Sequence, residues 1–398
     1  MSQARTGIRP AVLIGFADAL AAIESAWCLA DAGYEVHAFA RRGTRPALAR
    51  SKAVRIAYIT APEEDALSCA AEIAAVARET RVAAVLPLDD HAVWLCDRTC
   101  WDHASATHQN GTSRAVIAGP LAGSALLALD KRQQLTCAQA AGFMVPDSRD
   151  ASQPPPGNGP WMVKPALAVE LRGRQLHRPA GRVATRCAEI RDVVAAIGGP
   201  AIVQPLISGS GEGVFGLATS RGVTALSAHR RIRMMNPRGS GSSACRSVPV
   251  PDDLAGPVCE FISGSGWRGL FMIELLRDHQ GTPWFMELNG RAWGSMALSV
   301  GRGLAYPAWA VQAALSPDFA PAEPADTPEL VARHLGREIV HLGAVMTRGG
   351  APRLTTLRHV LTLRRRDRWY NWRPGQAGVF AVDTWATVHT QLRRRRSA

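Results

Sequence analysis

Two glutamates and an asparagine, Glu274, Glu287 and Asn289, lie in two apolar runs between Gly269 and Gly294. Carboxylate and amide oxygens are the donors that Mg²⁺ prefers, and Mg²⁺ held in this way commonly carries substrate phosphates. If the three side chains converge, the two carboxylates repel each other unless a cation lies between them. The alternative is a different strand register in which one glutamate faces solvent.

The positions of these side chains depend on a predicted β-hairpin. Residues 270–276 and 284–288 are apolar, and a polar turn at residues 278–283 separates them. If Arg277 faces Trp284 at the mouth of the turn, the two glutamates lie opposite each other. Side chains alternate along a strand, so the asparagine shares their face. The hairpin therefore predicts one patch of two carboxylates and an amide.

The same residues resemble a known family. The run IELLRD followed by GTPWFMELNGRAWGS resembles the carboxy-terminal strands of the ATP-grasp ligases, in which an acidic residue and a turn precede the pattern Glu-x-Asn-x-Arg. The resemblance implies that Glu274, Glu287 and Asn289 are magnesium ligands. It also implies that Arg291 steadies an acyl phosphate and the developing oxyanion.

Two lysines fit the family pattern, in a chain that has very few lysines beside its many arginines. Lys131 lies in LLALDKRQQLTCAQAAGFMVPDS, which predicts one helix that Gly142 ends. Lys164 ends the short apolar strand of WMVKPA, where an ammonium group is unusual unless it meets an anion. The resemblance implies that Lys131 reaches the nucleotide phosphates and that Lys164 contacts the α-phosphate and the adenine edge.

The stretch from residue 201 resembles the hinge of the ATP cleft. AIVQPLI predicts an apolar strand, and SGSGEGVFGLATSRG predicts a glycine-rich hairpin turn that leads into another strand. The resemblance implies that backbone groups of Gln204, Pro205 and Leu206 meet the adenine edge. It also implies that Glu212 lies near the ribose.

Two arginine-rich stretches are unusual. The family has a glycine-rich flap after the second lysine, whose backbone N–H groups close over the phosphates. The corresponding stretch here, ALAVELRGRQLHRPAGRV, has several arginines. Arg172 or Arg174 could therefore make some of the phosphate contacts. The resemblance implies that an arginine of HRRIRMMNPRGSGSSACRS approaches the γ-phosphate and the acceptor carboxylate, and alternation selects Arg231 or Arg233 as the candidate. The alternative is a solvent-exposed basic loop. Cys245 is interpreted as a packing residue, because no histidine with an orienting partner lies beside it.

The first part of the chain has the alternating rhythm of a doubly wound domain. Its glycines do not form the GxGxxG pattern of a dinucleotide site. It resembles a pre-ATP-grasp domain, in which Asp89 and Asp90 either border a ligand at the end of a strand or cap the next helix. Strands are predicted at residues 11–16, 35–40 and 82–88, and helices at residues 19–32 and 66–79.

Length and composition predict a soluble globular protein, with 398 residues of which 47% are hydrophobic and 20% charged. The predicted fold is α/β and α+β: a Rossmann-like domain at residues 1–120, an ATP-grasp domain of two α+β subdomains at 121–315, and a linker with a small basic extension at 316–398. A helix pair is expected at residues 297–315. No apolar run approaches a membrane span and the amino terminus lacks signal-peptide features, so we expect a cytoplasmic protein. The eight cysteines show no zinc spacing.

The net charge of +13 is concentrated near the C-terminus, where arginines cluster at residues 364–368 and 393–396. Here we predict a helix at residues 330–340, a strand at 342–347 and a basic helix at 354–368. Trp369, Tyr370 and Trp372 follow among the arginines, a composition that suits an anionic membrane surface. The alternative is that these aromatic residues pack on the ATP-grasp domain. Nucleic acid is an unlikely partner because no binding module is recognisable.

The resemblance implies an ATP- and Mg²⁺-dependent ligase that joins a small carboxylate to a small amine, with homo-oligomerisation left open. Such a reaction needs no protein nucleophile, because ATP activates the carboxylate as an acyl phosphate. The alternative is a nucleotide-binding scaffold without catalysis, whose basic tail docks on a membrane or polyanion. The altered flap motivates that alternative.

Overall fold

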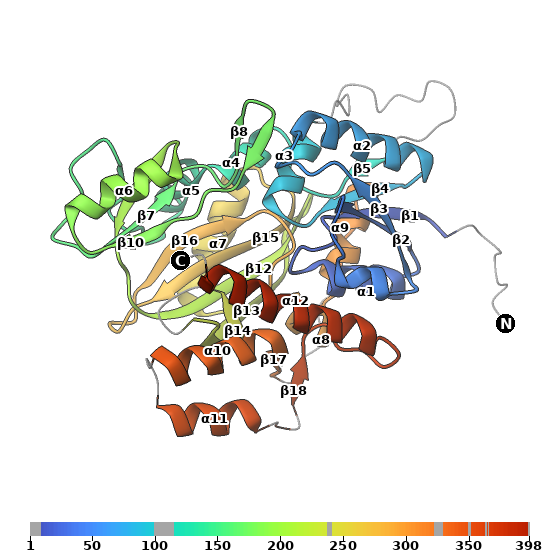
Figure 1. The fold of residues 1–398 in the computed structure, drawn as a ribbon. Coiled ribbons are helices and arrows are strands. Elements are labelled where there is room, and N and C mark those ends of the chain that lie inside the picture. The colour runs from blue at the N-terminus through green and yellow to red at the C-terminus, as the bar shows by residue number, and fades with distance from the viewer. Residues whose placement is uncertain are drawn as a thin grey trace.

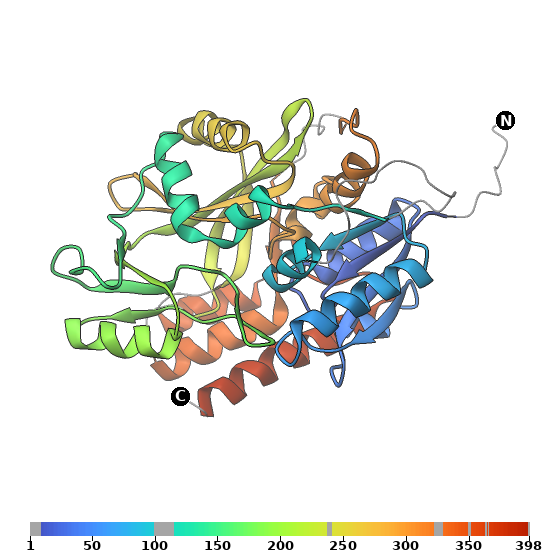
Figure 2. The same cartoon turned by 90° about the horizontal axis from the view of Figure 1, so that it is seen from above.

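The protein is described from a computed structural model that covers residues 9–98, 115–236, 241–321, 329–348, 352–362, 364 and 366–396. The chain forms an N-terminal α/β layer, a small sheet and a large sheet, and helices of the C-terminal extension pack against the large sheet (Figure 1). Figure 2 shows that the small sheet and the N-terminal layer flank the large sheet. Within the described ranges, no helix combines the length and the apolar character needed to cross a membrane.

The N-terminal layer is a five-stranded parallel sheet with the order β3-β2-β1-β4-β5. Alternating side chains of β1 pack on opposite faces, Val12 and Ile14 with α1 and Leu13 with α2. The predicted doubly wound arrangement is confirmed. The elements are β1 (Ala11–Gly15), α1 (Ala22–Asp31), β2 (Glu35–Arg41), the 3₁₀ helix η1 (Ala47–Arg50), β3 (Val54–Ile59), α2 (Ala66–Glu79), β4 (Ala84–Pro87), α3 (Asp90–Arg98) and β5 (Val116–Ile117).

The small sheet has the order β10-β7-β11-β6 and is covered by α6. A separate two-stranded hairpin, β8 with β9, lies between it and the N-terminal layer. The elements are α4 (Gly123–Leu129), α5 (Lys131–Ala140), β6 (Arg149–Asp150), β7 (Trp161–Pro165), β8 (Glu170–Arg172), β9 (Gln175–His177), β10 (Arg182–Ala184), α6 (Cys187–Ile197) and β11 (Ala201–Pro205).

The large sheet has the order β16-β15-β12-β13-β14-β17-β18. Helix α9 packs between this sheet and the N-terminal layer, where it contacts β4, β12 and β15. The predicted helix pair is confirmed as α8 and α9. The elements are β12 (Ser210–Thr219), β13 (Gly222–Met234), β14 (Ser242–Val248), α7 (Asp252–Gly264), β15 (Gly269–Arg277), β16 (Pro283–Asn289), α8 (Met296–Gly301), α9 (Tyr306–Leu315), β17 (Val331–Arg333) and β18 (Asp367–Trp369).

Two predictions for residues 121–219 were wrong. The single helix around Lys131 is divided, because Asp130 has extended backbone angles and its side chain accepts the Arg132 N–H, which begins α5. Of the glycines expected in a hairpin turn, Gly211 and Gly213 lie within β12 instead. A side chain at Gly211 would collide with Arg231, and one at Gly213 would collide with His229, so the glycines leave room for the neighbouring strand.

The C-terminal extension also differs from prediction. The expected strand at residues 342–347 is part of α10 (Leu335–Arg348). Val340, Ala344 and Val345 are buried while Ile339 and Met346 are exposed, which is a helical and not an alternating pattern. The expected basic helix ends early as α11 (Arg353–Leu361), and β18 and α12 (Ala377–Arg396) follow. Leu363 and Arg365 lie outside the described residues.

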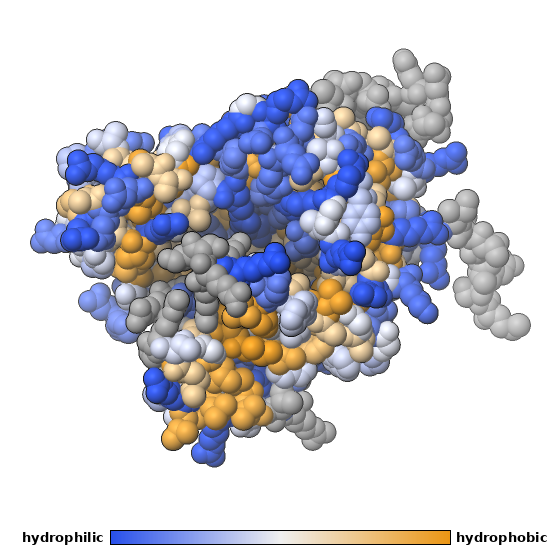
Figure 3. Space-filling view, in the orientation of Figure 1, coloured by the Kyte–Doolittle hydropathy of each residue, from blue (hydrophilic) through white to orange (hydrophobic). Residues whose placement is uncertain are grey.

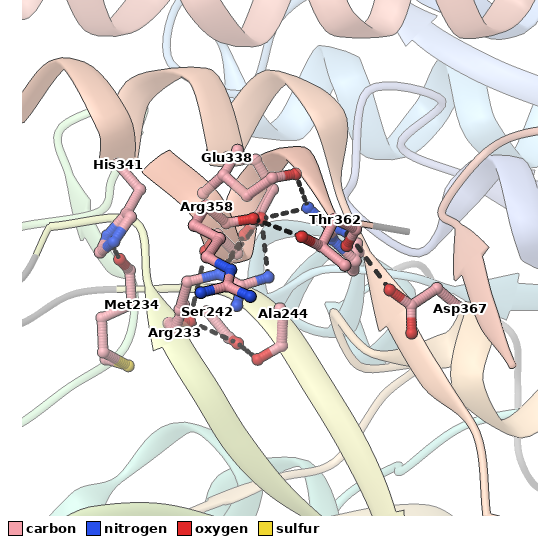
Figure 4. Close-up of polar contacts among 12 residues, drawn as sticks. Arg233, Met234, Ser242, Ala244, Glu338, His341, Arg358, Thr362 and Asp367 are labelled. Atoms are coloured by element: carbon pink, nitrogen blue, oxygen red, sulfur yellow. Dashed lines mark hydrogen bonds and ion pairs between the residues drawn. The ribbon is translucent and has the colours of Figure 1, made fainter. Parts of the chain in front are cut away.

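Buried ion pairs fasten the extension to the large sheet (Figure 4). The Glu338 carboxylate, which is fully buried, accepts hydrogen bonds from Arg233 Nη2 at 2.8 Å and Arg333 Nη2 at 3.0 Å. Arg333 also pairs with Asp367 at 3.3 Å. Tyr370 is buried beside Cys245, so this aromatic residue follows the packing alternative. The extension is therefore part of the folded body.

Glu24 on α1 contacts the extension and should make the stability of the protein depend on pH. Burial raises the pKa of Glu24 to about 7, although its carboxylate accepts the Asn371 N–H at 2.7 Å. Between pH 4.5 and 7 the unfolded chain loses this proton while the folded protein keeps it, so stability falls as pH rises. We expect Glu24→Gln to remove that decline, which is on the order of 3 kcal/mol.

The measurement is the free energy of urea unfolding of the parent and the variant as a function of pH. Glu64→Gln, at an exposed position of the same domain, is the matched control and should follow the parent. Equal pH slopes for the parent and Glu24→Gln would contradict the prediction.

Candidate active site

The hairpin of β15 and β16 brings the two glutamates together. Glu274 pairs directly with Glu287, as predicted. The assumed register at the turn is wrong, because Arg277 faces Pro283. A bulge at Met286 takes up the difference. The carbonyl of this bulged residue accepts a hydrogen bond from Lys164 Nζ at 3.4 Å, so the irregularity also connects the hairpin to the small sheet.

The oxygen donors of the hairpin fit a divalent cation such as Mg²⁺. Asn289 Nδ2 lies 3.4 Å from Glu287 Oε1, and Glu274 Oε1 pairs with Arg231 Nη2 at 2.5 Å. The second carboxylate oxygen of Glu274 and that of Glu287 are not used in these contacts and could bind a cation. No group of three or more His, Cys, Asp or Glu side chains in the described part of the chain could hold a metal, so the candidate set depends on two glutamates and an amide.

The two predicted lysines border one cavity of about 270 Å³ with the hairpin. Lys131 reaches it from the start of α5, and Lys164 from β7. Burial lowers the pKa of Lys164 to about 8, against the attraction of Glu287. An anion in the cavity would restore the protonated form. The cavity is bordered by Asp90, Ala128, Lys131, Gln134, Met162, Lys164, Pro165, Ala168, Arg178, Pro179, Gly181, Glu287, Leu288, Asn289 and Arg291.

Asp90 links three segments that are distant in sequence. Its Oδ1 accepts a hydrogen bond from Arg291 Nε at 2.7 Å, and its Oδ2 lies 2.7 Å from Arg178 Nη2. Burial alone would raise the pKa of Asp90, but the two guanidinium groups outweigh it and hold the pKa well below its usual range. Asp89 caps α3 by accepting the Ala92 N–H at 2.8 Å. The helix-cap alternative is thus confirmed for Asp89, whereas Asp90 borders the lysine cavity and its contact with a ligand stays a prediction.

Arg231 and Arg233 point to different places because a bulge separates them on β13. Arg231 pairs with Glu274 and borders a second cavity, of about 360 Å³, on the other side of Glu287 and Asn289. Arg233 pairs with Glu338 in the C-terminal extension. Of the two candidates, the structure brings only Arg231 to the hairpin.

Neither a family profile nor a curated protein sequence matches the chain, but solved structures do. An L-amino acid ligase from Bacillus licheniformis aligns with a TM-score of 0.55 and 16% identity, over 78% of this chain and 75% of that one. A biotin carboxylase–β,γ-ATP complex from Campylobacter jejuni gives 0.58 and 15%, over 79% and 72%. An ADP complex of N5-carboxyaminoimidazole ribonucleotide synthetase gives 0.57 and 12%, over 81% of each chain.

The chain has the ATP-grasp fold. The resemblance predicted from Glu-x-Asn-x-Arg is thereby confirmed at the level of the fold, with a Rossmann-like layer before the ATP-grasp sheets. Identities of 12 to 16% leave the roles of individual residues to the local geometry.

Two residues of the predicted hinge form hydrogen bonds with other residues of the protein. Gln204 Nε2 donates to Ser148 Oγ at 2.5 Å, and the Leu206 N–H donates to the Pro160 carbonyl at 2.9 Å. Neither residue borders the lysine cavity, nor does Pro205. Their contacts with adenine stay predictions.

Glu212 is buried in β12, where Arg230 Nη2 lies 2.7 Å from its Oε1 and Arg277 Nε lies 2.9 Å from its Oε2. Both carboxylate oxygens are therefore paired with guanidinium groups. A ribose hydroxyl would have to share this carboxylate with the two arginines. The ribose contact of Glu212 stays a prediction.

The stretch expected to hold the phosphate flap contains the β8–β9 hairpin. Arg172 pairs with Glu170, and Arg174 pairs with Asp65 of the N-terminal layer, so neither candidate borders the lysine cavity. Arg178, just after the hairpin, borders it instead and was missed. The sequence signal was weak, because Arg178 is one arginine among several in this stretch.

Proposed function

We propose that the chain is an ATP- and Mg²⁺-dependent ligase that joins a carboxylate to an amine through an acyl phosphate. The observation that carries the proposal is the convergence of Lys131, Lys164, Glu287, Asn289 and Arg291 on one cavity. Cationic groups opposite a carboxylate and an amide suit a metal-bound polyphosphate. The fold shared with nucleotide-bound carboxylases and an amino acid ligase supports this proposal.

Residues at different positions of the cavity have different proposed roles. A bound Mg²⁺ would neutralise phosphate charge during transfer, held by Glu274, Glu287 and Asn289. Lys131 and Lys164 bind the nucleotide phosphates as point charges. Arg291, fixed by Asp90, faces the charge that develops on the activated carboxyl group. The amine then displaces phosphate from that group.

Covalent catalysis by Cys245 is not part of the proposal. Its thiol is buried, and burial raises its pKa. Its Sγ donates to Ser242 Oγ at 3.1 Å. A thiol that stays protonated is a poor nucleophile, so the sequence-based interpretation of Cys245 as a packing residue is kept.

The test is phosphate release from ATP and Mg²⁺ with a mixture of carboxylates, a mixture of amines, or both. A ligase should release phosphate at its full rate only when both mixtures are present. Nucleotide binding without phosphate release in any mixture would favour the scaffold alternative. Release that is independent of both mixtures would contradict the ligase.

Lys164 should make nucleotide affinity depend on pH. As pH rises through about 8, the ammonium of the free protein loses its proton, so the affinity for a polyanion falls. In Lys164→Arg the charge persists and this fall should disappear. Calorimetric titration with an ATP analogue over that range measures both. Lys52→Arg, at an exposed position, should keep the parent's pH dependence, and a pH-independent parent would refute the assignment.

As a second proposal, helix α11 of the extension docks on an anionic membrane surface. Leu354 and Leu361 are 83% and 70% exposed, and Arg353 and Arg358 on the same helix are exposed as well. Figure 3 shows apolar side chains gathered over α10 and α11. Each basic residue near an anionic leaflet contributes about 1 kcal/mol, and exposed leucines add apolar burial.

Co-sedimentation with phosphatidylserine-containing and neutral vesicles tests this surface. We expect binding to the anionic vesicles alone, weakened by salt and lost in the double variant Leu354→Ser and Leu361→Ser. Leu67→Ser, at an exposed leucine of the N-terminal layer, should bind like the parent. No binding at low salt would leave α11 as ordinary surface.

A further inference from the structure

The second cavity extends the candidate active site toward the C-terminal helices. It shares Arg178, Glu287, Asn289 and Arg291 with the lysine cavity, so a molecule in it lies beside the proposed site of phosphate transfer. At about 360 Å³ it accommodates a molecule of amino-acid size. Its far side is bordered by Ser242, Cys245, Arg337 and Tyr370.

Three of the four guanidinium groups that border this cavity have carboxylate partners. Arg231 pairs with Glu274, and Arg178 and Arg291 pair with Asp90. Arg337 is the exception: no carboxylate of the described residues lies within ion-pair distance of it. Its Nη1 donates to the Ser242 carbonyl at 3.0 Å, and Asp383 acts on it only from a greater distance.

Arg337 is partly buried, so its unpaired guanidinium loses part of its hydration. Burial lowers the pKa of Arg337, which reflects the loss of water around its charge. The neighbouring groups do not supply an anion, because the pKa of the Tyr370 hydroxyl and that of the Cys245 thiol are both raised by burial. Trp293 Nε1, also on this cavity, has no acceptor within the described ranges. Arg337 and Trp293 therefore present donors to the cavity that lack a carboxylate or carbonyl partner among the described residues for their remaining N–H groups. The carboxylate and amide acceptors of the cavity, Glu274, Glu287 and Asn289, belong to the candidate metal site.

The position of Arg337 is fixed by the residue that follows it. Glu338 is held by Arg233 and Arg333 in the buried network of Figure 4. The first turns of α10 therefore present Arg337 to the cavity from a rigid anchor. Gly241 lies against Arg337, where an added Cβ would lie 3.5 Å from Nη1.

We propose that Arg337 binds a substrate carboxylate other than the one that ATP activates. This inference rests on the proposed ligase function and deepens it: the substrates include either a dicarboxylic acid or an amino acid that reacts through its amino group. A guanidinium fork binds a carboxylate by two parallel hydrogen bonds. Arg337 would then select substrates without taking part in phosphate transfer.

The test is calorimetric titration in the presence of Mg²⁺ and a non-hydrolysable ATP analogue. One arm uses L-amino acids and their amides, and the other uses succinate, glutarate and their half-amides. In at least one arm the acid should bind the parent about tenfold or more tightly than the amide. The arm that shows the preference identifies which substrate carries the carboxylate.

Arg337→Met should abolish that preference, and Arg337→Lys should keep part of it. Arg268→Met is the matched control, since Arg268 also donates to a backbone carbonyl, is exposed and should not affect binding. Equal binding of acids and amides to the parent, no binding of either, or a preference that survives in Arg337→Met overturns the inference. Titration needs no turnover, so a parent that prefers the acid but never releases phosphate would refute the ligase and not the role of Arg337.

Discussion

Glu287→Gln is expected to leave the fold intact and to lower Mg²⁺-dependent ATP consumption by at least about a hundredfold. Glu287 faces Glu274 across the hairpin, and Lys164 is close enough for its pKa to respond to Glu287. The substitution removes one of two negative charges offered to a cation and keeps the shape of the side chain. Because the two carboxylates repel, the metal-free variant should be as stable as the parent or slightly more stable.

Phosphate release and thermal unfolding of the metal-free protein measure the two effects. Glu260→Gln is the matched control, because Glu260 is an exposed glutamate of α7. It should change neither quantity. Unchanged ATP turnover in Glu287→Gln would refute the metal assignment, and a large loss of stability would show that Glu287 acts in the fold instead.

Asp90→Asn should have the largest effect on stability. The carboxylate compensates Arg291 and Arg178 at once, and its removal leaves two partly buried cations facing each other. Breaking a buried pair by removing one partner costs about 3 to 5 kcal/mol. Because Arg291 loses its orientation, ATP consumption should fall as well.

Urea unfolding and phosphate release test this prediction. Asp89→Asn is a close control, since asparagine also caps a helix and Asp89 caps α3. It should cost less than about 1 kcal/mol. Equal effects of the two substitutions would contradict the special role of Asp90.

The sequence predicted what depends on short-range periodicity. The strands at residues 11–16, 35–40 and 82–88, the helices at 19–32 and 66–79 and the pairing of Glu274 with Glu287 all follow from residues close together in the chain. The error at the turn was harmless only because a bulge at Met286 restored the register. A bulge depends on the packing of a whole sheet, and nothing local to Met286 indicated it.

The parts that could not be predicted depend on contacts between distant segments. Asp90 and Arg291 are separated by 201 positions, and each also resembles an ordinary surface charge when read alone. Arg337 lies in a segment that composition describes only as a basic extension. The strand expected at residues 342–347 failed because apolar residues in a short run fit a strand and a buried helix face equally well.

The central claim is that ATP activates a carboxylate as an acyl phosphate before an amine attacks. The most direct measurement uses amino acids and dicarboxylic acids labelled with ¹⁸O in their carboxyl groups, with ATP, Mg²⁺ and unlabelled amines, followed by mass spectrometry of the released phosphate. The account predicts that ¹⁸O passes to phosphate in step with formation of the amide and of ADP. Amide formation with unlabelled phosphate, or with release of AMP, would contradict it.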